Sequence, residues 1–154
     1  MALVKMKDLL RRAEEKNIGC GAFSVGNMEM VRGAIRAAEE LDTPIILQIA
    51  EVRLKNSPLH LMGPMMVQAA KEAKVDVAVH LDHGLKKETC LKALELGFSS
   101  IMYDCSTDSY EDNVRKVKEM ADIAHSYGAT IEGELGHVGD NPDSAEGSSH
   151  INPA

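Results

Sequence analysis

An α/β domain with a parallel sheet is the fold class that the sequence predicts. Apolar strand-like runs alternate with helical patterns along the 154 residues, and parallel strands need such crossover helices. Polar residues follow several different strands at their carboxyl ends, where closed β/α barrels have their active sites. No Gly-x-Gly-x-x-Gly loop follows the first strand, which weighs against a dinucleotide-binding open sheet. We therefore predict a TIM (β/α)8 barrel, of which this chain supplies about the first five βα units.

The strands are predicted by short runs of aliphatic residues bounded by turn-forming residues. The second run, Pro-Ile-Ile-Leu-Gln-Ile-Ala, starts at Pro44, and the third leads directly into the polar triplet Asp82-His83-Gly84. In chain order, we expect strands at residues 18–25, 44–50, 75–81, 99–103 and 129–134.

The helices are predicted by apolar residues at helical spacing between the strands. Asn27 can cap the helix after the first strand, and Gly97 and Gly128 can end the last two helices. We expect helices at residues 9–16, after Asn27, and at 59–73, 87–96 and 110–127. The expected buried faces are Met30, Val31, Ala34, Ala38 and Leu41 after Asn27, and Val114, Val117, Met120, Ala121 and Ala124 in the last helix.

The whole chain, residues 1–154, is expected to form a single domain, the N-terminal part of the barrel. Residues 136–154 are rich in Gly, Ser, Asn and Asp, and we expect a mobile loop there. A complete barrel needs about 250 residues, so the closing strands are expected elsewhere, and we interpret the chain as a fragment, a cleaved chain or the first half of a longer protein.

Composition and charge restrict the partners. The net charge of −7 argues against a nucleic-acid partner, which needs a basic patch. No run approaches the length of a membrane span, and the amphipathic N-terminus does not resemble a signal peptide. Three cysteines without close spacing fit reduced thiols and a cytoplasmic location.

The third strand carries the strongest functional signal. Alternation points Ala78, His80 and Asp82 into the barrel, with Asp82 at the mouth and His80 one layer beneath. His83 can then turn over the mouth, because Gly84 permits a sharp exit. A second interpretation remains open, in which Asp82 caps the next helix and His83 is a solvated loop residue. His80 taken alone is more typical of a satisfied core histidine than of a ligand.

The next two strands repeat this arrangement. Asp104 ends the fourth strand, either as a site residue or as a turn residue, and Ser106 and Thr107 are candidates for a helix cap or a phosphate contact. Glu132 and Glu134 share a face of the fifth strand, and such an inward pair favours a cation or acid–base chemistry.

Imidazole and carboxylate groups together suit zinc or a similar cation. Catalytic zinc usually has three protein ligands, so further ligands are expected from the missing part. No lysine stands at a strand tip, which weighs against a Schiff base. Cys105 near the mouth is more typical of a buried packing thiol than of a nucleophile.

Four segments resemble the class II, metal-dependent ketose-bisphosphate aldolases, a family that includes the fructose- and tagatose-bisphosphate enzymes. The segments are Gly-Ala-Phe-Ser-Val at 21–25, His-Leu-Asp-His-Gly at 80–84, Ser-Ile-Met-Tyr-Asp-Cys-Ser at 100–106 and Glu-Gly-Glu-Leu-Gly at 132–136. They cover nearly the whole chain in order.

The resemblance implies a homodimeric or homotetrameric TIM barrel that cleaves a ketose 1,6-bisphosphate to dihydroxyacetone phosphate and glyceraldehyde 3-phosphate. It implies that Asp82 is the proton donor and acceptor, that His83 is a zinc ligand, and that Asp104 and Glu134 hold a second or alternative cation, divalent or monovalent. His80 and Glu132 are expected to support these residues.

Two departures from the family pattern concern the substrate and the mobile loop. Ala50 stands where many members have Ser or Thr, with Glu51 after it, and the substrate-binding residues stay unassigned. Asp143 and Glu146 are candidates for the mobile-loop acid. Two other classes remain open: another metal-dependent lyase or epimerase of phosphosugars, and an inactive barrel fragment.

Overall fold

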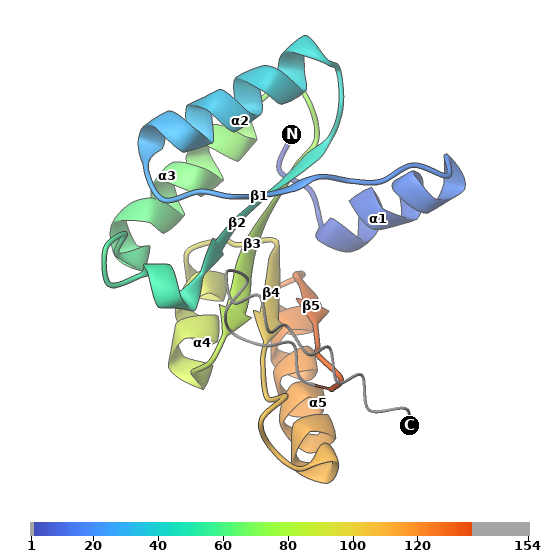
Figure 1. Ribbon diagram of the computed structural model, residues 1–154, viewed down its shortest axis with the longest axis vertical. Helices are drawn as coiled ribbons and strands as arrows, with labels where there is room; N and C mark the ends of the chain where they lie inside the picture. Colours follow the sequence, from blue (N-terminus) through green and yellow to red (C-terminus); the bar gives the residue numbers. More distant parts are fainter. Residues whose placement is uncertain (1, 137–154) are drawn as a thin grey trace, which may run out of the picture.

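A single parallel sheet organises the computed structural model, which describes residues 2–136 (Figure 1). Its strands are β1 (Ala22–Ser24), β2 (Ile45–Ala50), β3 (Val77–Gly84), β4 (Ser100–Tyr103) and β5 (Thr130–Glu132). The helices are α1 (Met6–Glu15), α2 (Met28–Glu40), the 3-10 turn η1 (Glu51–Arg53), α3 (Leu59–Glu72), α4 (Lys87–Glu95) and α5 (Tyr110–Ser126).

The strand order distinguishes a barrel from an open sheet. The strands lie in the order β1-β2-β3-β4-β5, and every neighbouring pair is parallel. A doubly wound sheet reverses its order at a switch point, whereas a barrel adds each strand beside the preceding one. The predicted order of five βα units is therefore confirmed.

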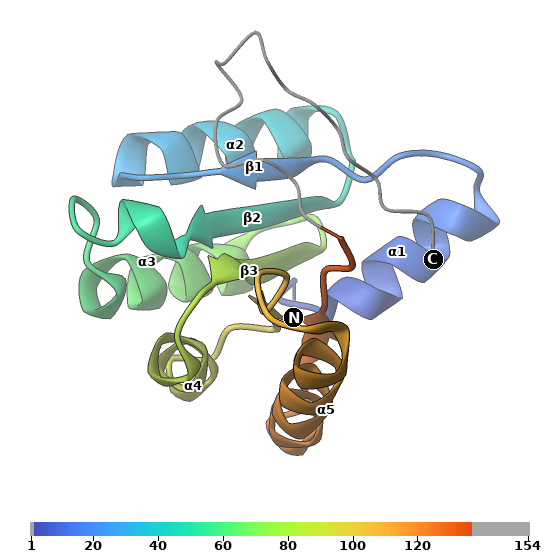
Figure 2. The same ribbon diagram turned by 60° about the horizontal axis from the view of Figure 1, so that its bottom comes forward.

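The two faces of the sheet pack against different helices. Val77, Val79 and Leu81 join the large core that also contains residues of α2 to α5, and Figure 2 shows these helices around the outer side of the curved sheet. Ala78 and Ile46 instead pack against α1 on the opposite face. The predicted alternation along β3 is confirmed.

An irregularity in β3 changes the direction of its tip. Leu81 pairs with Ile101 and Gly84 with Tyr103, so three steps along β3 match two steps along β4. The extra residue is a β-bulge, a feature that re-aims side chains beside active sites. Regular alternation would point His83 outward with Leu81. The bulge allows Asp82 and His83 to reach the same side.

The left-handed backbone at this tip belongs to His83, with φ 44°, and not to Gly84, from which we expected the sharp exit. Gly84 is required for space, because a Cβ there would lie 2.6 Å from Cys90 Sγ and 2.7 Å from the Met102 carbonyl oxygen. The predicted strand end at residue 81 was wrong, since β3 continues through Gly84.

The other element predictions hold in outline. Asn27 caps α2 by accepting from the Met30 N–H at 2.9 Å, and Gly97 and Gly128 adopt positive φ after α4 and α5 as expected. β1 and β5 are shorter than expected, and α1 begins earlier. The predicted helix faces were partly wrong, because three apolar members are exposed: Met30, Leu41 and Val114.

Two predictions concern membranes and the chain end. Within residues 2–136, no helix is both long and apolar enough to span a membrane. The predicted loop at 136–154, with Asp143 and Glu146, lies outside the described residues apart from Gly136.

Candidate active site

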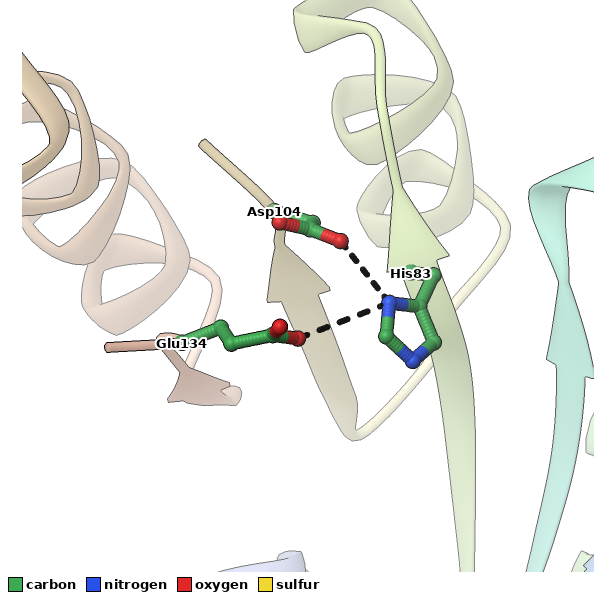
Figure 3. A group of neighbouring side chains, drawn as sticks. All are labelled: His83, Asp104 and Glu134. Atoms are coloured by element: carbon green, nitrogen blue, oxygen red, sulfur yellow. Dashed lines mark hydrogen bonds and ion pairs between the residues drawn. The ribbon is translucent and has the colours of Figure 1, made fainter. Parts of the chain in front are cut away.

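Three successive strands bring their polar ends together. His83 comes from β3, Asp104 directly follows β4, and Glu134 follows β5. Figure 3 shows the three side chains converging, with His83 Nδ1 directed at both carboxylates. Nδ1 donates to Asp104 Oδ2 at 2.8 Å and lies 3.7 Å from Glu134 Oε2. The structure thus brings together the three residues that the sequence singled out as metal ligands.

A hydrogen bond fixes each acidic residue of this group at its own strand end. Asp104 Oδ1 accepts the Ser106 N–H at 3.0 Å, so its other oxygen is aimed at His83. The main-chain oxygen of Glu134 accepts from Asn113 Nδ2 at 2.8 Å, and Asn113 is buried on α5. The first bond orients the Asp104 carboxylate, the second fixes the backbone of Glu134, and both carboxylates face His83.

The electrostatics of the group favour a cation. Burial lowers the pKa of His83, but the hydrogen bond to Asp104 and the charges of Asp82, Asp104 and Glu134 outweigh it, and the pKa is raised. Burial opposes ionisation of Asp104, yet its hydrogen bonds from His83 and Ser106 leave its pKa lowered. The carboxylates that raise the pKa of His83 would also stabilise a metal cation at this position, and such a cation would compete with a proton for the ring nitrogen.

The donor set fits a metal ion. One ligand atom from each of His83, Asp104 and Glu134 can be chosen so that all lie within 4.8 Å of one another. An imidazole nitrogen and carboxylate oxygens are ligands for zinc and for similar divalent metals. This group is the candidate metal site of the described residues.

Asp82 lies beside this group and has a different partner. Gln48 on β2 donates through Nε2 to Asp82 Oδ2 at 3.0 Å and to Ser24 Oγ at 3.2 Å. Burial and the charge of Asp104 raise the pKa of Asp82, although the His83 charge opposes this shift. The interpretation of Asp82 as a helix cap was wrong, since Lys86 is the N-cap of α4 and its side chain makes no cap bond.

His80 lies one layer deeper, as predicted from its parity. It is 2% exposed, with Nδ1 2.8 Å from Ser100 Oγ and Nε2 3.5 Å from Glu132 Oε2. Burial and the charge of His83 lower the pKa of His80 to about 4, so the ring is neutral near pH 7. Burial, then the charge of Asp82, raises the pKa of Glu132.

The two glutamates expected as a pair have separate partners. Glu132 faces His80, whereas Glu134 faces His83. Only Glu134 belongs to the candidate metal group among the described residues. The two glutamates therefore do not form a carboxylate pair: Glu132 contacts the buried His80, and Glu134 contacts His83 in the candidate metal site.

The remaining candidates lie near the mouth without joining the group. The helix-cap interpretation of Ser106 and Thr107 was wrong, because Ser109 caps α5 by accepting the Asp112 N–H at 3.2 Å. Cys105 is buried, and burial raises the pKa of its thiol, which favours packing over nucleophilic attack.

Sequence reasoning missed Gln48 and Asn113, and it noted Glu51 only as the residue that follows Ala50. Gln48 is a polar residue inside an apolar strand, and its register with His80 places it on the inner face. Asn113 is a polar residue on the buried side of α5. In both cases the available signal was a polar residue at a position that periodicity assigns to an interior.

The fold and the site define part of a β/α barrel with a candidate metal centre at the carboxyl ends of its strands. The model of the family described as "Fructose-bisphosphate aldolase class-II" matches residues 4–153. The chain belongs to this family of aldolases, which is generally metal-dependent.

Individual relatives agree with this assignment. The fructose-bisphosphate aldolase of Thermus caldophilus is 44% identical over 136 residues, which are 88% of this chain and 44% of that protein. The sulfofructosephosphate aldolase of Alkalicoccus urumqiensis is 38% identical and aligns with 93% of this chain and 50% of its own length. The crystal structure of the YdjI aldolase from Escherichia coli K12 superimposes with a TM-score of 0.84 at 36% identity, covering 88% of this chain and 52% of that one. The chain thus spans about half the length of these relatives.

Proposed function

We propose that the barrel to which this chain contributes is a zinc-dependent class II aldolase. It would cleave a ketose 1,6-bisphosphate reversibly to dihydroxyacetone phosphate and glyceraldehyde 3-phosphate. The observation that carries the proposal is the convergence of His83, Asp104 and Glu134 within 4.8 Å, beside a carboxylate, Asp82, whose pKa is raised.

His83 would hold the metal, with Asp104 and Glu134 offering a second or alternative position for a divalent or monovalent cation. Zinc, when bound, supplies a Lewis acid for the negative charge that develops beside the ketose carbonyl. Catalytic zinc usually has three protein ligands, so the remaining ligands would come from the strands that complete the barrel.

Asp82 would move the proton. In cleavage, the carboxylate takes the proton of the C4 hydroxyl as the C3–C4 bond breaks, and in condensation it returns that proton. Gln48 holds Oδ2, which orients the carboxylate so that Oδ1 can meet a substrate hydroxyl. A raised pKa brings Asp82 closer to the working pH and makes proton transfer in both directions easier.

His80 and Glu132 would support the inner wall beneath this site. A neutral His80 adds no positive charge below Asp82, and its ring forms a hydrogen bond with Ser100 on the neighbouring strand β4. We further propose a cytoplasmic homodimer or homotetramer without nucleic-acid or membrane partners.

The substrate is proposed as a phosphorylated ketose, with fructose and tagatose bisphosphate as candidates. The relative named as a sulfofructosephosphate aldolase adds a sulfonated ketose phosphate as a third candidate. The end of β2 has Ala50 followed by Glu51 in place of the Ser or Thr that many family members have there. This position therefore does not identify the substrate, and cleavage of the three compounds should be compared directly.

Activity and metal content of the assembled barrel test the proposal together. Cleavage of the three ketose phosphates should stop with a strong chelator and return with added zinc. His83→Ala should lose the metal in elemental analysis, whereas His60→Ala, an exposed histidine on α3, should retain it. Full cleavage in the chelator, or unchanged metal in His83→Ala, would reject the proposal.

A further inference from the structure

The backbone of His83 needs an external constraint. Its φ of 44° is a left-handed conformation that non-glycine residues rarely adopt, and such strain persists only where the surroundings over-determine it. On one side, β4 supplies this constraint, because the Asp104 N–H donates to the Gly84 carbonyl at 3.0 Å. The other side of the tip is the turn at Leu85 and Lys86, before α4.

Glu51 holds that turn. Its Oε2 accepts the Leu85 N–H at 2.6 Å and the Lys86 N–H at 3.0 Å. Its Oε1 accepts from Thr89 Oγ1 at 2.8 Å. Three donors converge on one carboxylate, and charge-assisted hydrogen bonds of this kind are about twice as strong as neutral ones.

The Glu51 carboxylate accepts the N–H groups at the start of α4, which no side chain at the N-cap position of that helix accepts. Lys86 is the N-cap of α4 without a side-chain cap bond, although Asp or Ser usually fills that position. Glu51, which lies on η1, places its carboxylate at the N-terminal end of α4. A negative charge is stabilised there by the helix dipole. Its predecessor Ala50 pairs with Asp82, so the end of β2 lies beside Asp82 while Glu51 reaches the turn that follows His83.

We propose that Glu51 is a positioning residue of the candidate metal site: by fixing the 85–86 turn, it keeps the His83 ring directed at Asp104 and Glu134. The inference rests on the proposed function and deepens it at the same site. Glu51 acts through the backbone, because its own carboxylate is occupied by three donors and lies outside the described metal group.

Glu51→Gln is the test variant, because it keeps the side-chain size while removing the charge and one acceptor. Metal affinity, measured by competition with a chelator in the assembled barrel, should fall by about 10- to 100-fold, as is typical when a partner of a metal ligand is removed. In the metal-free protein, the His83 ring signal in NMR should shift, and the Leu85 and Lys86 amides should exchange faster. Thr89→Val, which removes one of the three donors, should change both readouts less and in the same direction.

Glu88→Gln is the matched control, because it removes a negative charge from the first turn of α4 without touching the 85–86 turn. It should leave metal affinity and the His83 signal at wild-type values. The proposal is overturned if Glu51→Gln binds metal within twofold of wild type, or if Glu88→Gln loses as much affinity.

The readouts separate this inference from the proposed function. Metal affinity and the His83 signal are measured without substrate, so an inactive protein in which Glu51→Gln alters both would still support the role of Glu51. An active aldolase in which Glu51→Gln alters neither would overturn this inference alone.

Discussion

The two faces of β3 differ in what they contribute. Val77, Val79 and Leu81 face the outer helices and are 0% exposed. His80 and Asp82, on the other face, make polar contacts at and below the barrel mouth. The apolar face gains free energy by leaving water, whereas the polar face carries groups whose charged forms burial disfavours. Up to Asp82, before the bulge, residue parity therefore separates the core side of β3 from its polar side, and substitutions on the two faces should have different effects.

Asp82→Asn should have the largest effect, and it should be on rate. Loss of the proton-transfer group should lower kcat for ketose bisphosphate cleavage by about 10²- to 10⁴-fold. Metal content and the unfolding midpoint should stay near wild type, since an amide oxygen can still accept from Gln48. Asp76→Asn, at the opposite end of the strand, is the control and should keep kcat. Normal turnover in Asp82→Asn would contradict the division between the faces.

Leu81→Ala should act on stability instead. Truncation of this fully buried side chain should lower the free energy of unfolding by about 2–5 kcal/mol through lost burial and a cavity. Urea unfolding measures the change. Leu85→Ala, whose side chain is 54% exposed, should change stability by less than about 0.5 kcal/mol. Equal losses in the two variants would show that the outer face of β3 is not part of the core.

His80 should make the polar face sensitive to acid. The folded-state pKa is about 4, below the usual value, so the unfolded chain binds more protons between about pH 6.5 and pH 4. The free energy of unfolding should therefore decrease as the pH is lowered from about 6.5 to about 4, by about 3 kcal/mol from this group if the full shift applies.

Urea unfolding of the metal-free protein at several pH values tests this prediction by comparing the pH dependence of stability in wild type and in His80→Gln. His80→Gln should lose less stability than wild type as the pH falls from 6.5 to 4, because the amide does not titrate and can still bond to Ser100. The raised pKa values of Asp82 and Glu132 act in the opposite direction and largely cancel in the comparison. His60→Gln should follow wild type. Parallel curves for His80→Gln and wild type would mean that the buried ring does not control acid stability.

Much of the fold follows from local patterns along the chain. Five apolar runs predicted five strands because a strand buried on both sides must be apolar almost throughout. Asn27, Gly97 and Gly128 marked helix ends because capping and positive φ depend on single residues. The polar tips His83, Asp104 and Glu134 were recognised because parallel strands in one sheet end at the same edge.

Other features depend on neighbours that are distant in sequence. Glu51 contacts a turn 34 and 35 residues away, and Gln48 on β2 bonds to Asp82 on the neighbouring strand β3, 34 residues along the chain. Val114 is exposed while Asn113 is buried, since helix rotation depends on what the helix packs against. No local pattern contains this information.

The tip of β3 combines both kinds of information. The residue types Asp82 and His83 and their place at a strand end were determined by the sequence alone. That both side chains reach the same side was decided by the bulge against β4 and the left-handed backbone of His83. Strict alternation forbids that arrangement, and a strained residue persists only where its tertiary surroundings hold it, here the neighbouring Gly84 bonded to Asp104 after β4.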